Sequence, residues 1–229
     1  MAINKICESF EAAVSGIKDG STILVSGFGG AGMPTELLNA LREQGASELT
    51  IVSNNAGVGK EGIGGLLLDG RVKKVICSYP RSGGSVVFEE MWAAGKVDLE
   101  VVPQGTLSER IRAAGAGIGG FYTPTGVGTQ LAEGKEVREI NGRLQVLEAP
   151  LKGDVAFILA RQSDRWGNLV YNKSARNFGT VMAPAADLTV VQVHEVVELG
   201  VLDPEVIVTP SIFVDRVVKM SGPGMGERQ

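Results

Sequence analysis

The sequence predicts an α/β protein with an open, mostly parallel sheet, helices on both faces of that sheet and a β-hairpin excursion. Short apolar runs alternate with segments whose apolar residues recur at helical spacing. An Asn-Gly pair flanked by alternating residues indicates the hairpin. Because no linker or low-complexity stretch divides the 229 residues, we expect a single domain over residues 1–229.

The first elements of the chain carry clear end signals. Apolar residues at positions 6, 10, 13, 14 and 17 predict a helix over 5–18, which an Asp-Gly pair ends. The apolar run 22–25 is typical of a buried parallel strand. Pro34 then opens a second helix, since the first turn of a helix does not need its N–H, and Gly45 ends that helix.

Strands and helices continue to alternate through the first half of the chain. Apolar runs predict three more strands, over 49–53, 72–78 and 97–102. A helix is expected over 85–94. Thr106 and Glu109 have the spacing of a capping box, so we expect another helix to begin there.

The second half is less regular. Residues 137–147 alternate around Asn141 and Gly142, which predicts the hairpin. Buried strands are expected over 154–160 and 188–193. Two further runs are candidates for additional strands, 206–208 and 213–218.

Composition and charge exclude several classes of protein. With 22 basic against 26 acidic residues, the net charge of −4 argues against nucleic-acid binding. The uncharged window 113–132 contains six glycines and Pro124, so we predict a loop region there and not a membrane span. The first 18 residues lack the uninterrupted apolar core of a signal peptide, and we expect a cytoplasmic protein.

The cysteines, the one histidine and the glutamates are interpreted as structural or surface residues. Cys7 and Cys77 are too few for a disulfide framework and fit reduced thiols. No cluster of cysteines accompanies His194, so no metal site is predicted, and His194 is expected to have a structural role at the end of a strand. Glu148 and the other glutamates are interpreted as solvated surface.

Four loops follow the carboxyl ends of the predicted parallel strands. They cover residues 26–32, 54–57, 79–84 and 103–105. In open parallel sheets, ligands bind beyond these ends of the strands. We therefore expect the four loops to converge on a binding site.

A glycine-rich loop between a strand and a helix has three common interpretations: a dinucleotide-binding site, a P-loop or a close-packing feature. Its G-x-G-x-x-G spacing over 27–32 allows backbone N–H groups to approach an anion. A nicotinamide dinucleotide would also need an acid at the end of the second strand, where Ser53 and Asn54 stand instead. A P-loop would need a Gly-Lys-Ser or Gly-Lys-Thr sequence, which is not present. The third interpretation is that the glycines only allow a helix to pack closely on a strand.

Longer motifs resemble the A (alpha) subunit of the family I coenzyme A transferases. Residues 19–34 are similar to the signature of that family. Further similar segments run along nearly the whole chain, at residues 53–57, 102–106, 117–126, 167–171 and 174–178. The resemblance implies a CoA-transferase-like, Rossmann-related fold. It also implies that coenzyme A moves from an acyl-CoA to a free carboxylic acid.

The resemblance implies that this chain holds half of an active site. In the family, a glutamate of the B (beta) subunit, or of the second half of a fused chain, attacks the thioester and then carries coenzyme A. No segment here resembles the motif around that glutamate. A B subunit is therefore the implied obligate partner, in a heterodimer or a pair of heterodimers. The coenzyme A thioester is a substrate, and no tightly bound cofactor is expected.

The resemblance also suggests roles for individual residues. The amides of Asn54, Asn55 and Gln104 would orient the acyl group and stabilise its oxyanion, because a carboxylate there would repel the developing charge. Contact with coenzyme A is implied for the residues of the glycine loop, Ser26, Gly27, Phe28, Gly29, Gly30, Ala31 and Gly32.

The segment from Cys77 to Phe88 looks closest to the 3-oxoadipate branch of the family, whose acids are dicarboxylates. Arg81 follows the end of a strand, and the hypothesis is that its guanidinium binds the distal carboxylate. A surface arginine in a turn is the alternative for that residue. For the chain as a whole, the alternative within the family is an acetate- or acetoacetate-utilising transferase, which would have much the same motifs. A nicotinamide-dependent dehydrogenase and a non-catalytic ligand-binding regulator are the alternatives from other classes.

Overall fold

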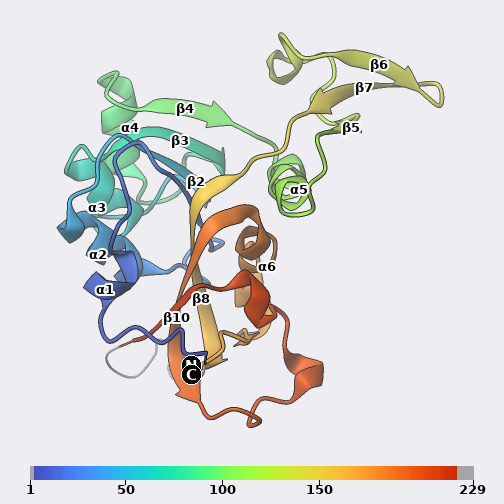
Figure 1. The fold of residues 1–229 in the computed structure, drawn as a ribbon. Coiled ribbons are helices and arrows are strands. Elements are labelled where there is room, and N and C mark those ends of the chain that lie inside the picture. The colour runs from blue at the N-terminus through green and yellow to red at the C-terminus, as the bar shows by residue number, and fades with distance from the viewer. Residues whose placement is uncertain (1–2, 221–229) are drawn as a thin grey trace.

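An eight-stranded sheet runs through the structure, a computed structural model that describes residues 3–220 (Figure 1). Seven strands lie in the order β11-β10-β8-β1-β2-β3-β4 with parallel pairing, and β9 pairs antiparallel with β8. The bounds are β1 (Thr22–Val25), β2 (Leu49–Asn55), β3 (Val72–Tyr79), β4 (Asp98–Val101), β8 (Gly153–Asp164), β9 (Leu169–Val170), β10 (Ala186–Val197) and β11 (Arg216–Lys219). The predicted parallel sheet is confirmed. The ends of the predicted domain, 1–2 and 221–229, lie outside the described residues.

Helices pack on both faces of this sheet, as predicted. Successive residues of β1 divide between two hydrophobic clusters, Ile23 into one and Leu24 into the other, because successive strand residues face opposite ways. The first cluster includes residues of α1 (Phe10–Val14), α2 (Thr35–Gln44), α3 (Ile63–Leu68) and α4 (Val86–Ala93). The second includes residues of α5 (Gln104–Gly115) and α6 (Gly179–Met182). Short 3-10 turns complete the list, η1 (Gln130–Ala132), η2 (Lys173–Arg176), η3 (Ala183–Ala185), η4 (Pro204–Val206) and η5 (Ser211–Phe213).

A second, three-stranded sheet projects from the main body and is called the arm below (Figure 1). It pairs β5 (Phe121–Thr123), β7 (Arg143–Glu148) and β6 (Val137–Ile140) in antiparallel fashion. The predicted hairpin is confirmed, with its turn at Asn141 and Gly142. Both turn residues have positive φ, +52° and +74°, which is the conformation a two-residue type I′ turn requires.

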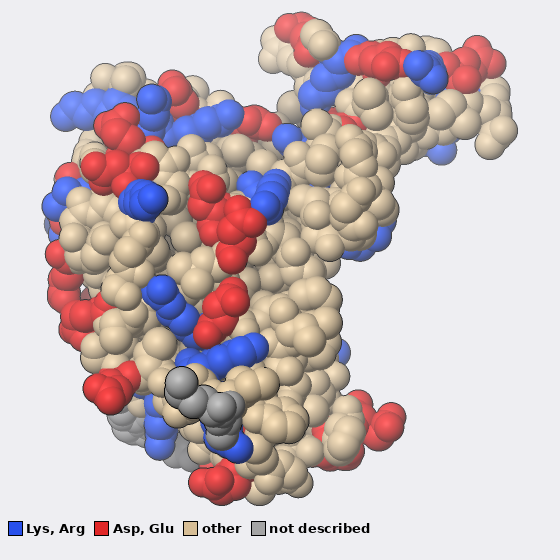
Figure 2. Space-filling view, viewed as in Figure 1, with Lys and Arg blue, Asp and Glu red and all other residues tan. Residues whose placement is uncertain are grey.

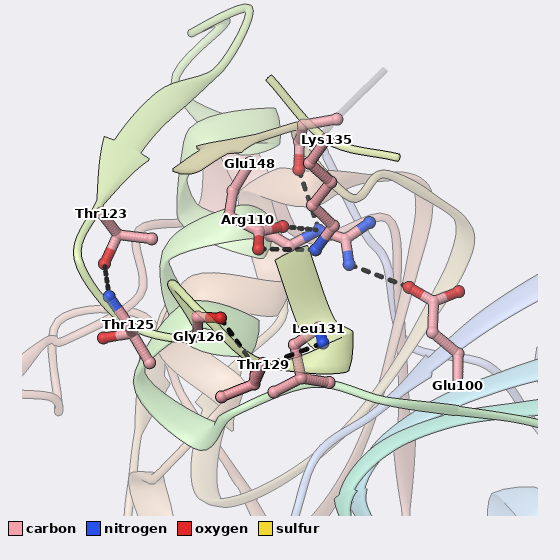
Figure 3. Close-up of polar contacts among 10 residues, drawn as sticks. Glu100, Arg110, Thr123, Thr125, Gly126, Thr129, Leu131, Lys135 and Glu148 are labelled. Carbon is pink, nitrogen blue, oxygen red and sulfur yellow. Dashed lines mark hydrogen bonds and ion pairs between the residues drawn. The ribbon is translucent and has the colours of Figure 1, made fainter. Parts of the chain in front are cut away.

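A network of charged side chains joins the arm to the main body (Figure 3). Glu148 of β7 binds Lys135 Nζ at 2.6 Å and lies 3.9 Å from Arg110 Nε. Arg110 of α5 also binds Glu100 of β4 at 3.0 Å, and Glu100 binds Lys74 of β3 at 2.5 Å. The interpretation of Glu148 as solvated surface is wrong, because its side chain is only 5% exposed. Two cations from distant parts of the chain compensate its burial.

The N-terminal helix is shorter than predicted. It covers only α1, with Ser9 as the N-cap that accepts a hydrogen bond from the N–H of Ala12. Residues before it lie against the edge of the sheet, where the N–H of Cys7 donates to the carbonyl of Val217 at 2.7 Å. The residues before α1 therefore pair with the open edge of the sheet instead of joining the helix, although their apolar spacing is helical.

Other boundaries also differ from the expectations. Helix α3 was not predicted, because its sequence contains two glycines, yet burial stabilises it and Leu66 is fully buried. Helix α5 begins at Gln104, two residues before Thr106, so the capping box is wrong. Asn54 and Asn55 belong to the end of β2 and not to the loop. Residues 206–208 form no strand; only residue 206 falls in a 3-10 turn.

Charged side chains are unevenly distributed on the face shown in Figure 2. Groups of both signs are interspersed with uncharged residues over the left side of this view and along the arm, whereas the hollow below the arm is bordered mainly by uncharged residues. In the described range 3–220, no helix combines the length and the apolar character needed to cross a lipid bilayer.

Candidate functional site

The loops at the carboxyl ends of the central strands converge on one pocket, as predicted. All four expected loops or the strand ends before them contribute to its wall. The pocket has a volume of about 400 Å³, and its lining residues are Phe28, Gly29, Asn54, Asn55, Val58, Ser78, Tyr79, Ser82 and Gln104. A volume of this size is within the range of pockets that bind small molecules.

The glycine loop folds into a tight turn at the rim of this pocket. The N–H of Phe28 donates to the carbonyl of Ala31 at 2.9 Å, and the N–H of Ala31 donates back to the carbonyl of Phe28 at 3.1 Å. Gly29 and Gly30 form the corner, and within residues 3–220 their N–H groups have no hydrogen-bond acceptor. Unoccupied backbone donors in a glycine-rich loop that precedes a helix are suited to binding an anionic group.

Ser26 lies beneath the loop and not in the pocket. Its hydroxyl donates to the carbonyl of Gly32 at 2.8 Å and accepts from the N–H of Leu159 at 3.2 Å. The residue is 1% exposed. The side chain therefore ties the loop to β8, and any direct contact with a ligand falls to other loop residues, above all Phe28 and Gly29.

The two asparagines at the end of β2 differ in their hydrogen bonds. Asn55 Oδ1 accepts from the N–H of Gly57 at 2.9 Å, so part of its capacity serves its own turn. Asn54 Oδ1 is buried without a partner, and no hydrogen bond in the described range occupies Asn54 Nδ2. Asn54 thus keeps an amide donor for a ligand. Gln104, exposed in the first turn of α5, adds a third amide to the same pocket.

Two serines of the pocket wall were missed by the sequence analysis. The hydroxyl oxygens of Ser78 and Ser82 are buried and have no partner among the described residues. Together with Asn54, they account for three of the five such atoms in residues 3–220. Buried polar atoms without partners are rare in proteins, so their gathering around one pocket indicates a ligand or ordered water there. The available signal was the position of Ser78 at the end of a predicted strand.

Arg81 does not line the pocket, although its neighbours Tyr79 and Ser82 do. Its guanidinium lies 6.0 Å from the ring centre of Trp92, and its Nε is 3.7 Å from a carboxylate oxygen of Glu89. The side chain is 68% exposed, so both contacts are weak.

Neither Cys77 nor His194 lines this pocket. Burial raises the pKa of the Cys77 thiol to about 12, so the thiol stays protonated and is a poor nucleophile at neutral pH. His194 lies inside β10, not at its end, and its Nδ1 is buried without a partner. Among the described residues, no group of three or more His, Cys, Asp or Glu side chains has a metal-binding arrangement.

A second hollow of about 240 Å³ adjoins the pocket on the other side of Phe28 and Gln104. Its lining residues are Phe28, Gln104, Gly105, Ser108, Asn177 and Phe178. The two hollows share Phe28 and Gln104, so the candidate site extends from β2 and β3 across the glycine loop to the start of α5.

A comparison with family models decides between the interpretations of this site. The model described as coenzyme A transferase matches residues 7–220. The chain belongs to the coenzyme A transferase family. This membership decides against the dehydrogenase interpretation of the glycine loop.

Two relatives within the coenzyme A transferases are similar over almost their full length, and a third over less than half of its own. The chain is 62% identical to the A subunit of the 3-oxoadipate CoA-transferase of Pseudomonas putida, over 96% of this chain and 95% of the relative. It is 58% identical to the protein of the same name in Acinetobacter baylyi, over 94% and 95%. The mouse mitochondrial succinyl-CoA:3-ketoacid coenzyme A transferase 2A is 44% identical, over 94% of this chain but only 44% of its own.

Solved coenzyme A transferase structures have the same fold. The acyl-CoA transferase of Escherichia coli O157:H7 superposes with a TM-score of 0.84 at 25% identity, over 96% of this chain and 48% of that chain. Glutaconate coenzyme A-transferase of Acidaminococcus fermentans superposes with a TM-score of 0.82 at 21% identity, over 96% and 76%. The chain thus spans about half the length of the Escherichia coli enzyme.

Proposed function

We propose that this chain is the A subunit of a two-subunit 3-oxoadipate CoA-transferase, which moves coenzyme A from succinyl-CoA to 3-oxoadipate. The observation that carries the proposal is the identity of 62% and 58% to the A subunits of two 3-oxoadipate CoA-transferases along almost their whole length. The A subunit of the probable succinyl-CoA:3-ketoacid transferase of Bacillus subtilis follows at 48%. Acetoacetate or acetate as the acceptor is therefore the second candidate function.

The reaction exchanges one thioester for another without net hydrolysis. A glutamate carboxylate of the B subunit attacks the succinyl-CoA carbonyl, which forms an acyl-glutamyl anhydride and releases the coenzyme A thiolate. The thiolate attacks the glutamyl carbonyl, which releases succinate and leaves a glutamyl-CoA thioester. The same two steps in reverse, with 3-oxoadipate, return the glutamate and yield 3-oxoadipyl-CoA. Coenzyme A thus enters and leaves as substrate.

This chain contributes the uncharged donors around the reacting carbonyl. Each attack turns a carbonyl oxygen into an oxyanion, and the amides of Asn54 and Gln104, which line the pocket, are the donors we assign to it. Asn55 lines the same pocket, and its side-chain oxygen accepts a hydrogen bond from the N–H of Gly57 in the following turn. The unoccupied N–H groups of Gly29 and Gly30 are assigned to the anionic or carbonyl groups of the coenzyme A thioester.

The B subunit is assigned to the open side of the pocket. Three large apolar residues of the pocket wall are strongly exposed in the single chain: Phe28 at 49%, Val58 at 51% and Tyr79 at 62%. Exposed apolar side chains of this size around a pocket are typical of a surface that a second protein covers. Since coenzyme A esters are intracellular metabolites, we propose that the assembled enzyme works in the cytoplasm.

Arg81 is the proposed determinant for dicarboxylate acceptors. Its pair with Glu89 is exposed and 3.7 Å long, and such a pair contributes roughly 1 kcal/mol or less. The guanidinium can therefore leave Glu89 and bind a distal carboxylate at the pocket rim. In the assembled enzyme, we expect Arg81→Gln to weaken the binding of 3-oxoadipate, with a rise of about tenfold in its KM. The KM of acetate, which has no distal carboxylate, should not change.

The assembled enzyme with an acceptor panel tests the proposed function. This chain, co-produced with a B subunit, should form 3-oxoadipyl-CoA from succinyl-CoA and 3-oxoadipate, with higher kcat/KM than for acetoacetate or acetate. The isolated chain should be inactive. Borohydride applied after loading with acyl-CoA should reduce a glutamyl thioester in the B subunit. Preference for acetoacetate would favour the second candidate, and a label on this chain would overturn the division of roles.

A further inference from the structure

The glycine loop is held in shape by a side chain from the far end of the sequence. Asn177 Oδ1 accepts from the N–H of Gly27 at 3.0 Å, and Asn177 Nδ2 donates to the carbonyl of Ala31 at 2.9 Å. One amide thus spans the loop from its first residues to its last. The two regions are 150 residues apart in the chain.

Only a primary amide of this length meets both ends of the loop. Asn177 Oδ1 accepts a second hydrogen bond, from the N–H of Phe178 at 2.7 Å, so the oxygen is fixed between two donors. The Nδ2 group then faces the carbonyl of Ala31. An aspartate keeps the acceptors but places a second oxygen against that carbonyl, and alanine loses both contacts.

The backbone of the same segment touches the loop as well. A Cβ atom added to Gly32 would lie 2.3 Å from the carbonyl oxygen of Ala175 and 2.9 Å from Asn177 Nδ2. The segment itself is anchored, because Phe178 is 6% exposed in the second hydrophobic cluster. Before it, the buried hydroxyl of Tyr171 lies 2.8 Å from the hydroxyl of Thr209, and burial raises the Tyr171 pKa to about 12.

We propose that Asn177 is a positioning residue for coenzyme A transfer. It fixes the ends of the loop so that the unoccupied N–H groups of Gly29 and Gly30 are aimed at the bound thioester. The loop cannot do this by itself, because Gly29 has positive φ and glycines at the corner have many accessible conformations. This inference rests on the proposed function and adds to it a residue from the second half of the chain.

Kinetics of the assembled A/B enzyme test the role in catalysis. Asn177→Ala and Asn177→Asp should each lower kcat/KM for succinyl-CoA about 10²-fold, the usual effect of a displaced reactive group, and leave the KM of the acceptor acid within twofold of wild type. Asn141→Asp is the matched control, since it makes the same charge change in the exposed arm turn. It should keep full activity. Unchanged kcat/KM in both Asn177 variants would overturn the proposal.

Amide hydrogen exchange tests the hydrogen bonds between Asn177 and the glycine loop without any enzyme assay. In the isolated chain, Asn177→Ala should expose the N–H of Gly27 to exchange, whereas Asn177→Asp should keep it protected. The N–H of Leu24 in β1 serves as the internal reference for global stability. Equal Gly27 protection in wild type and Asn177→Ala would overturn the proposal. An inactive wild-type A/B enzyme with the expected exchange pattern would instead refute the proposed function. The hydrogen bonds between Asn177 and the glycine loop would still be supported.

Discussion

Particular glycines in two glycine-rich regions of the chain serve different physical purposes, close packing in one case and chain reversal in the other. In the loop 26–32, a Cβ on Gly32 would collide with the backbone of Ala175, so the glycine permits close approach of two segments. In the stretch 113–132, Gly117 and Gly128 also have positive φ, but no atom lies within 4 Å of their Cβ positions. Those two glycines serve turns, whereas a Cβ on Gly120 of the same stretch would lie 3.1 Å from the carbonyl oxygen of Glu148. Close packing thus explains the glycine at position 32, and chain reversal explains those at positions 117 and 128.

The two regions are also held by different forces. Neutral hydrogen bonds from Ser26 and Asn177 hold the loop, so its shape is insensitive to pH in the neutral range. The stretch 113–132 leads into the arm, whose junction with the body depends on the ion pairs of Arg110 and Glu148. Charge therefore stabilises the arm, and packing together with amide geometry stabilises the loop.

The largest effect is expected at the point of closest approach in the loop. Gly32→Ala adds a methyl group 2.3 Å from a carbonyl oxygen at a φ of +77°, and should lower the free energy of unfolding by roughly 2–5 kcal/mol. Urea denaturation of the isolated chain measures this change. The assembled enzyme should lose its activity. A variant as stable and active as wild type would show that the loop does not pack against residue 175.

The next largest effect is expected where the arm meets the body. Glu148→Ala leaves Arg110, 12% exposed, and the more exposed Lys135 without their shared carboxylate, and should destabilise the chain by about 2–3 kcal/mol. Denaturant midpoints measure the loss. Glu139→Ala, in the exposed part of the arm, is the matched control and should change stability by less than about 0.5 kcal/mol. Equal losses in both variants would contradict a special role of the junction.

A smaller effect is expected from acid. Burial raises the pKa of Glu100, but hydrogen bonds from Lys74 and Arg110 outweigh it and hold that pKa below its usual value of 4.5. Because the folded-state pKa is the lower one, this stabilisation is present above pH 4.5 and is lost as the pH falls through the folded-state pKa. Urea midpoints of wild type and Glu100→Gln should therefore converge on acidification. A constant difference between pH 7 and pH 3 would rule out this linkage.

The smallest effect is expected at a glycine that only reverses the chain. Gly117 follows α5, with a φ of +68° and open space around its Cβ position. Gly117→Ala should lower the free energy of unfolding by about 1 kcal/mol, the conformational term alone. Thermal or urea unfolding provides the measurement. A loss as large as that of Gly32→Ala would erase the distinction between the two regions.

Local patterns were sufficient for the parts of the fold that depend on neighbours in sequence. The run Thr22–Val25 was predicted with the bounds that β1 has, because a short apolar run with clear end signals has few alternatives. The hairpin turn followed from Asn141 and Gly142, whose positive φ is a local property. Convergence of the loops followed from parallel pairing, since parallel strands end at the same edge.

Local patterns were insufficient where burial or distant partners decide. The segment of α3 contains two glycines and is helical because the body buries Ile63, Leu66 and Leu67. Glu148 looks like a surface residue in sequence, and its partners Lys135 and Arg110 lie 13 and 38 positions away. Ser78 and Ser82 stand out only when their buried hydroxyls are seen to lack partners.

The sequence by itself determined the parallel sheet, the edge at which a site forms and the family to which the motifs belong. These depend on apolar periodicity, turn chemistry and ordered motifs, all of which are written along the chain. The tertiary structure alone decided that Asn177 forms hydrogen bonds with both ends of the glycine loop, and that Arg110 and Glu148 pair where the arm joins the main body. Contacts between residues so far apart leave no periodic signal, because folding, and not spacing, brings their side chains within hydrogen-bond distance.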